Sequence, residues 1–175
     1  MTEHIDSLLL QRMFRNACSF SNIAYLCEVE RTPITFPLDS YSVPGIVNSA
    51  FSCEVFLKSL LIFHGASLED VKKHRHLLAD LWKEYKIKDP SSSSQLEQQV
   101  ILHYKHGNTE LFQKKLLEIS NAFYNWRYIY EETRKLPADR NFMRYLRDAL
   151  REKCCAKYYN KTWNEFKENG FKWYE

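Results

Sequence analysis

The spacing of apolar residues along the chain predicts a succession of helices. Apolar residues recur every three or four positions through most of the sequence, as on the buried face of a helix. Glycine and proline, which interrupt helices, number only 4 and 5 among the 175 residues. The predicted helices cover about residues 4–30, 43–64, 68–85, 94–106, 109–135 and 138–158, with a short amphipathic tail through Phe166. We expect the helices at 43–64 and 109–135 to form the central pair of the fold.

Turn-forming residues separate these predicted helices. Three prolines predict an extended crossing segment over residues 31–45, because proline disfavours helical backbone in the residue before it. Gly65 is expected to end one helix as a left-handed cap, and Ser67 to cap the start of the next. The stretch 89–94, with its proline and serines, predicts a polar loop.

The pattern as a whole predicts an all-α protein. We expect an up-and-down helical bundle of four to five core helices, with extra N- and C-terminal helices. The chain shows no internal repeat and no linker composition, so residues 1–175 are predicted to form a single domain.

Composition narrows the functional classes only slightly. Hydrophobic residues make up 45% and charged residues 27%, as in ordinary globular proteins, and the net charge of +3 does not by itself favour a nucleic-acid binder. The five cysteines include no CxxC pair, which indicates reduced thiols and no cysteine zinc site. No signal peptide or membrane span is recognisable. We therefore expect a soluble, cytoplasmic protein without a metal or cofactor.

Glu54 and Lys58 are the first candidate pair for a functional site. They stand four residues apart on the predicted helix at 43–64, so their side chains face each other one turn apart. One interpretation is a surface or rim ion pair that contributes a few tenths of a kcal/mol, roughly 0.2–0.5. The other places the pair in a polar cleft, because the flanking residues are strongly apolar.

The second candidate is the basic segment from Lys72 to His76. It could meet a phosphate group, or it could be the solvated first half of a helix. His74 and His76 are two residues apart, which places them on different faces of a helix. A metal-dependent hydrolase built on these two histidines is therefore the least favoured of the enzymatic hypotheses.

The third candidate is an aromatic segment that contains Arg127. Arg127 and Glu131 are four residues apart, and the surrounding aromatic residues predict that Arg127 is partly buried and needs a partner. This pair could be a structural bridge. Alternatively, Arg127 could hold a phosphate or a nucleobase, with Tyr128 stacked beside it.

Taken together, these segments resemble the HEPN superfamily of helical domains, including AbiV-like defence-associated members. The residues that carry the resemblance lie in Asn48–Lys58, His76–Leu81 and Phe123–Glu131. The resemblance implies a helical core at about residues 43–135 and a homodimer. It also implies either a metal-independent ribonuclease of a defence or toxin–antitoxin system, or a non-catalytic domain that binds RNA, a nucleotide or a protein partner.

The chain departs from the nuclease pattern of that family. Arg127 matches the family's arginine, but Tyr128 replaces a small polar residue and no histidine follows within the expected four to six positions. The catalytic candidates are Arg127, Glu131 and His76, with His76 supplied by another helix. The substrate-binding candidates are Glu54, Lys58, Asn48, Tyr128 and His74. The competing hypothesis is a non-enzymatic module for dimerisation or protein interaction, in which Arg127 is sealed in the core.

Overall fold

The computed structural model describes residues 7–29, 41–104, 109–131 and 139–168. These residues are helical throughout, with short turns between helices and no strand. The elements are α1 (Ser7–Val29), α2 (Ser42–Phe63), α3 (Leu68–Lys73), α4 (Leu78–Lys88), α5 (Pro90–Tyr104), α6 (Thr109–Ile119), α7 (Ala122–Arg127), the 3-10 helix η1 (Ile129–Glu131), α8 (Arg140–Tyr159) and α9 (Trp163–Glu168). The predicted all-α class is confirmed.

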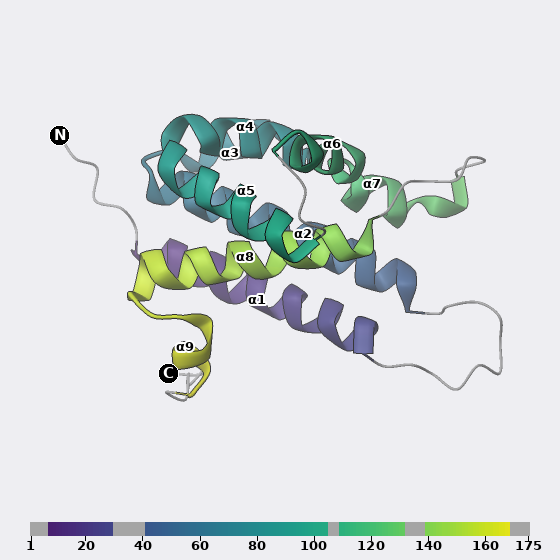
Figure 1. Cartoon of the computed structure of the whole chain (residues 1–175), viewed down its shortest axis with the longest axis horizontal. Coiled ribbons are helices and arrows are strands. Elements are labelled where there is room, and N and C mark those ends of the chain that lie inside the picture. Colours follow the sequence, from purple (N-terminus) through teal and green to yellow (C-terminus); the bar gives the residue numbers. More distant parts are fainter. Residues whose placement is uncertain (1–6, 30–40, 105–108, 132–138, 169–175) are drawn as a thin grey trace.

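Helix α2 is the centre of the bundle. It packs against α1, α8, α7 and α4, while α5 packs on α8 and on α4 and α6 (Figure 1). It is also long and apolar enough to cross a membrane, but 72% of its most apolar window is buried inside the fold. That burial is the pattern of the core helix of a soluble protein.

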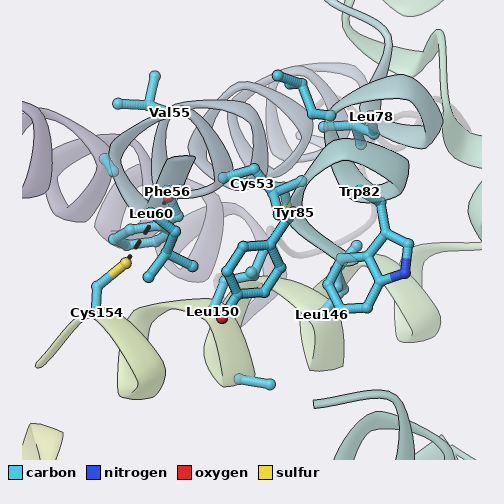
Figure 2. Packing of buried hydrophobic residues seen from close by; sticks show 14 of the residues in the cluster. Cys53, Val55, Phe56, Leu60, Leu78, Trp82, Tyr85, Leu146, Leu150 and Cys154 are labelled. Carbon is cyan, nitrogen blue, oxygen red and sulfur yellow. Dashed lines mark hydrogen bonds between the residues drawn. The ribbon is translucent and has the colours of Figure 1, made fainter. Parts of the chain in front are cut away.

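The core lies between α2 and the helices on either side of it. Figure 2 shows Trp82 and Tyr85 of α4 pointing toward Leu146 and Leu150 of α8, and all four side chains are almost completely buried. Helix α1 adds Phe14 to the same core. Buried residues thus come from α1 and α8 as well as from the segment 43–135 in which the core was expected.

Helix α2 ends as its sequence predicts. Gly65 adopts a left-handed conformation with φ of 84°, and its backbone N–H donates to the carbonyl of Ile62. The Ser67 side chain then caps α3 by accepting from the N–H of Asp70 at 3.1 Å. Both predicted caps are confirmed, and each satisfies backbone groups that a helix end leaves unpaired.

Two helices that were predicted to be continuous are interrupted. The segment 68–85 divides into α3 and α4 at residues 74–77. The described part of 109–135, which ends at Glu131, divides into α6, α7 and η1. The two interruptions meet at Ser120. The N–H of Leu78 donates to the Ser120 carbonyl, and the N–H of Ala79 donates to the Ser120 hydroxyl, each at 3.0 Å. Ser120, in the turn between α6 and α7, therefore satisfies the first backbone donors of α4.

Three other predictions need correction. The central partners of α2 are α1 and α8, because the apolar residues of 109–135 are divided between two short helices. The serine stretch predicted as a loop belongs to α5, which begins at Pro90 because Asp89 accepts from the N–H of Ser92 at 3.1 Å and caps it. Most of the predicted extended segment lies outside the described residues, but its last part, from Ser42, already belongs to α2.

Candidate functional site

Glu54 is a buried carboxylate at the middle of α2. It is 2% exposed, and Lys58 one turn later donates to its Oε1 at 2.7 Å. Its Oε2 lies 2.8 Å from Nδ1 of His76, which comes from the turn between α3 and α4. Glu54 is thus buried rather than at the surface, whereas Lys58, whose side chain is 15% exposed, lies at the rim. The pair is desolvated, and it binds a histidine from a distant part of the sequence.

The turn that carries His76 contains a strained residue. Arg75 has φ of 49°, a left-handed conformation that costs a residue with a side chain roughly 1–2 kcal/mol. The Arg75 carbonyl accepts from the Lys58 ammonium at 2.7 Å, so Lys58 holds the turn and Glu54 at once. The Arg75 side chain points to the exposed surface. Such strain is concentrated at functional sites more often than elsewhere.

His76 keeps one ring nitrogen available. Nδ1 of His76 faces Oε2 of Glu54, and the tautomer in which Nδ1 donates to this carboxylate leaves Nε2 as an acceptor. The side chain is 41% exposed, and Nε2 makes no hydrogen bond within the described residues. His76 is thus an oriented imidazole with a free acceptor.

His74 has a separate partner. Its Nε2 contacts a carboxylate oxygen of Glu84, so the two neighbouring histidines bind different acids. Within the ranges that the structure describes, no three His, Cys, Asp or Glu side chains are grouped as a metal site requires. The contacts of His74 do not join it to the site at His76.

Phe123 of α7 connects His76 to Arg127. Its ring centroid lies 4.5 Å from that of His76 and 5.0 Å from that of Phe51 on α2. The guanidinium carbon of Arg127 lies 5.8 Å from the same Phe123 centroid, within the range of a cation–π contact. Phe123 thereby brings α2, the α3–α4 turn and α7 into one site. Its role was not predicted from the sequence, because nothing in the local pattern distinguishes it from a core residue.

Arg127 is exposed, contrary to the prediction that it is partly buried. Helix α7 ends at Arg127, and Glu131 lies in η1, so the two residues do not share one helical face. Glu131 is also exposed, and no ion pair joins it to Arg127 among the described residues. Arg127 instead lies against Phe123 and against the ring of Tyr128, at 5.4 Å. The predicted ion pair between Arg127 and Glu131 is therefore not formed among the described residues.

Asn48 lies apart from the Glu54–His76 pair. It stands in the first turns of α2, and its side-chain amide donates to the carbonyl of Pro44 at 2.7 Å. That bond stays within the beginning of α2. Tyr128, in contrast, belongs to the site through Arg127 and also contacts Tyr124 at a ring distance of 5.0 Å.

A second polar cluster lies at the C-terminal end of α2 and was not predicted. Oδ2 of Asp89 is 3.0 Å from Nζ of Lys157 and 3.1 Å from Nε2 of His64, and neither contact has hydrogen-bond geometry. Burial by itself would raise the pKa of Asp89, but hydrogen bonds from Ser92 and the pairing with Lys157 outweigh it and lower that pKa to about 2. Because Asp89 also caps α5, this cluster joins α2, α5 and α8 and is structural.

Comparison of the chain with protein-family models, with curated proteins and with solved structures gives no match. The resemblance to the HEPN superfamily therefore rests on the sequence segments alone. In the candidate site, direct contacts join Glu54, Lys58, His76, Phe123 and Arg127.

Proposed function

We propose that this protein is a cytoplasmic, HEPN-like domain that binds RNA or a nucleotide at His76, Phe123 and Arg127. One observation carries the proposal. An oriented histidine and an exposed arginine both lie against one aromatic ring, although they come from separate parts of the chain. Arg127 supplies a planar cation suited to phosphate, and the adjacent aromatic rings suit a nucleobase.

The buried part of the site supports this role by positioning His76. Glu54 fixes the tautomer of the imidazole, as carboxylate partners of catalytic histidines do. Lys58 is occupied by Glu54 and by the Arg75 carbonyl, so it is a positioning residue with no free charge for a ligand. The ligand would therefore meet His76 and Arg127, with Glu54 and Lys58 behind them.

The same geometry suits metal-independent cleavage of RNA as a further step. Nε2 of His76 would take the proton of a ribose 2′-hydroxyl while the 2′-oxygen forms a bond to phosphorus. The bond from phosphorus to the 5′-oxygen then breaks, and water returns a proton to that oxygen. Arg127 would neutralise the phosphate charge that develops. The products are a 2′,3′-cyclic phosphate and a free 5′-hydroxyl.

Binding of fluorescently labelled RNA to wild type, Arg127→Ala and Arg127→Lys tests the proposal. We expect alanine to weaken binding about ten-fold or more, and lysine to restore part of it through its charge. Because Arg127 is exposed, the melting temperature of both variants should stay within about 1–2 °C of wild type. Equal RNA binding by all three proteins would refute the site.

Cleavage is tested separately with His76→Ala and His76→Gln. If His76 acts as the base, both variants should lose 2′,3′-cyclic phosphate production even at RNA concentrations that saturate their binding. A wild-type protein that binds RNA and leaves it intact would restrict the function to binding.

A second candidate function, homodimerisation, is favoured by a separate observation. The C-terminal half of α1 exposes several apolar side chains at helical spacing, with Ile23 at 47%, Leu26 at 49% and Val29 at 49%. An exposed apolar helix face of this kind is typical of a protein interface. Sedimentation of wild type and of Leu26→Glu tests it, since a charge at the centre of a dimer interface should produce monomers.

A further inference from the structure

Three tyrosines extend the site from Arg127 across α7 and η1. Tyr124 is 53% exposed and Tyr130 is 76% exposed, which is unusual for large aromatic side chains. The ring centroids of Tyr124 and Tyr128 are 5.0 Å apart, and those of Tyr128 and Tyr130 are 6.2 Å apart. The tyrosines therefore form a continuous row at the surface, and Arg127 lies over its middle ring at 5.4 Å.

The rings in this row do not stack on one another. Tyr124 is inclined by 51° to Tyr128, and Tyr128 by 66° to Tyr130. No two neighbouring rings of the row lie face to face, so they do not cover one another's whole faces as a stacked row would. Ring faces combined with a nearby cation are the features that single-stranded nucleic acids use, because every base has a flat face and every nucleotide a phosphate.

We propose that Tyr124, Tyr128 and Tyr130 stack successive bases of single-stranded RNA, with Arg127 on the phosphate between them. This inference rests on the proposed function and names its substrate class. A mononucleotide would fill only the place beside His76 and Arg127, whereas a single strand would continue onto the tyrosines. An RNA duplex should bind weakly, because its bases are already stacked and paired.

The charges around the row set the side on which the strand's backbone lies. Glu131 follows Tyr130 directly and is exposed, so it repels phosphate at that end. Arg127 attracts phosphate at the middle of the row. The backbone should therefore run on the Arg127 side, with bases toward the tyrosine rings.

The test compares two double variants with wild type. Tyr124→Leu/Tyr130→Leu removes both outer rings and keeps apolar area, whereas Tyr124→Phe/Tyr130→Phe keeps the rings and removes the hydroxyls. Fluorescence anisotropy would measure binding to labelled oligouridylate about 12 nucleotides long, to a duplex of the same length and to uridine monophosphate. Circular dichroism melting curves would confirm that both variants fold.

We expect the leucine pair to weaken single-strand binding about ten-fold or more, at unchanged monophosphate binding, and the phenylalanine pair to resemble wild type. Single-strand binding that is unaffected by leucine, with monophosphate binding still dependent on Arg127, would overturn the inference and leave the proposed function intact. If wild type bound neither RNA nor the monophosphate, both the proposed function and the inference about the tyrosines would be refuted. Leucine variants that lose self-association at unchanged RNA affinity would assign the row to a protein interface. A wild-type protein that binds the duplex as tightly as the single strand would also overturn the inference.

Discussion

Charged side chains are used differently in two regions of this molecule. Where α1, α2 and α8 meet, Arg147 is 1% exposed, and its guanidinium donates to Glu28 at 2.7 and 3.3 Å, to Ser49 at 2.9 Å and to Asp148 at 3.2 Å. Around the α3–α4 turn and α7, the side chains of Arg75 and Arg127 are exposed and have no hydrogen bond or ion pair within the described residues.

The difference separates structural charges from charges available to a ligand. A buried arginine that is fully hydrogen-bonded holds helices in one arrangement, and its removal leaves a carboxylate without a counter-charge. An exposed arginine against aromatic rings contributes little to folding and keeps its donors for a phosphate. The second region is the one in which we propose a binding site, and four substitutions test this comparison.

The largest effect is expected from Arg147→Met. Methionine keeps much of the side-chain volume, but Glu28 then loses its bidentate partner. We expect the free energy of unfolding to fall by about 3 kcal/mol, measured by urea denaturation. Arg12→Met on the exposed side of α1 is the control and should change it by less than about 0.5 kcal/mol. A loss below about 1 kcal/mol would show that the buried network is not needed for stability.

Glu54→Gln should have the next largest effect and should act on both stability and binding. The Lys58 ammonium, whose side chain is 15% exposed, would lose its carboxylate, and His76 would lose its orienting charge. We expect a loss of about 2 kcal/mol in urea denaturation, together with weaker RNA binding. Glu69→Gln is the matched control, since its side chain is 77% exposed and should change neither property. Unchanged stability in Glu54→Gln would argue against a desolvated ion pair.

The Asp89 cluster predicts a loss of stability in acid. The pKa of Asp89 is lowered to about 2 in the folded protein, against about 3.9 for an unfolded aspartate. The contribution of ionised Asp89 to the free energy of unfolding is therefore complete above about pH 4, and it disappears as the pH falls through about 2. We expect the free energy of unfolding of wild type to exceed that of Asp89→Asn by about 1–2 kcal/mol at neutral pH. This difference should shrink below about pH 4. A difference that is independent of pH would refute this assignment.

The smallest expected change in stability comes from Arg75→Gly. Glycine adopts the left-handed conformation without strain, so the free energy of unfolding should rise by about 1 kcal/mol. If Arg75 belongs to the binding site, RNA binding should weaken at the same time. Asn160→Gly provides the control, because Asn160 has φ of 52° at the end of α8, far along the chain from the site residues. The Asn160→Gly protein should bind RNA as wild type does. If the Arg75→Gly protein also bound RNA with wild-type affinity, Arg75 would lie outside the site.

The sequence predicted those elements whose signals lie within the element itself. Helix α2 runs from Ser42 to Phe63, close to the expected 43–64, because its apolar face is continuous and a glycine follows it. The break at residues 74–77 carries no comparable local signal. It depends on the Lys58 ammonium that binds the Arg75 carbonyl and on Ser120, which caps α4 from the turn between α6 and α7.

The candidate site divides in the same way. The Glu54–Lys58 contact could be predicted, since residues four apart on a helix face each other. The partnership of Glu54 with His76, 22 residues away, could not, and neither could the Phe123 ring that joins His76 to Arg127. The expected Arg127–Glu131 pair failed because α7 ends at Arg127, and helical spacing has no meaning beyond the end of a helix.

The sequence by itself determined that this chain is all-α, where its main helices lie and which charged pair occupies the middle of α2. These properties follow from the periodicity of apolar residues and from contacts one turn apart, which are local. The tertiary structure decided where two long helical segments break, which acids His74 and His76 contact and that Arg127 is exposed beside a row of tyrosines. Those outcomes depend on contacts between residues far apart in the chain, for which the spacing along the sequence carries no information.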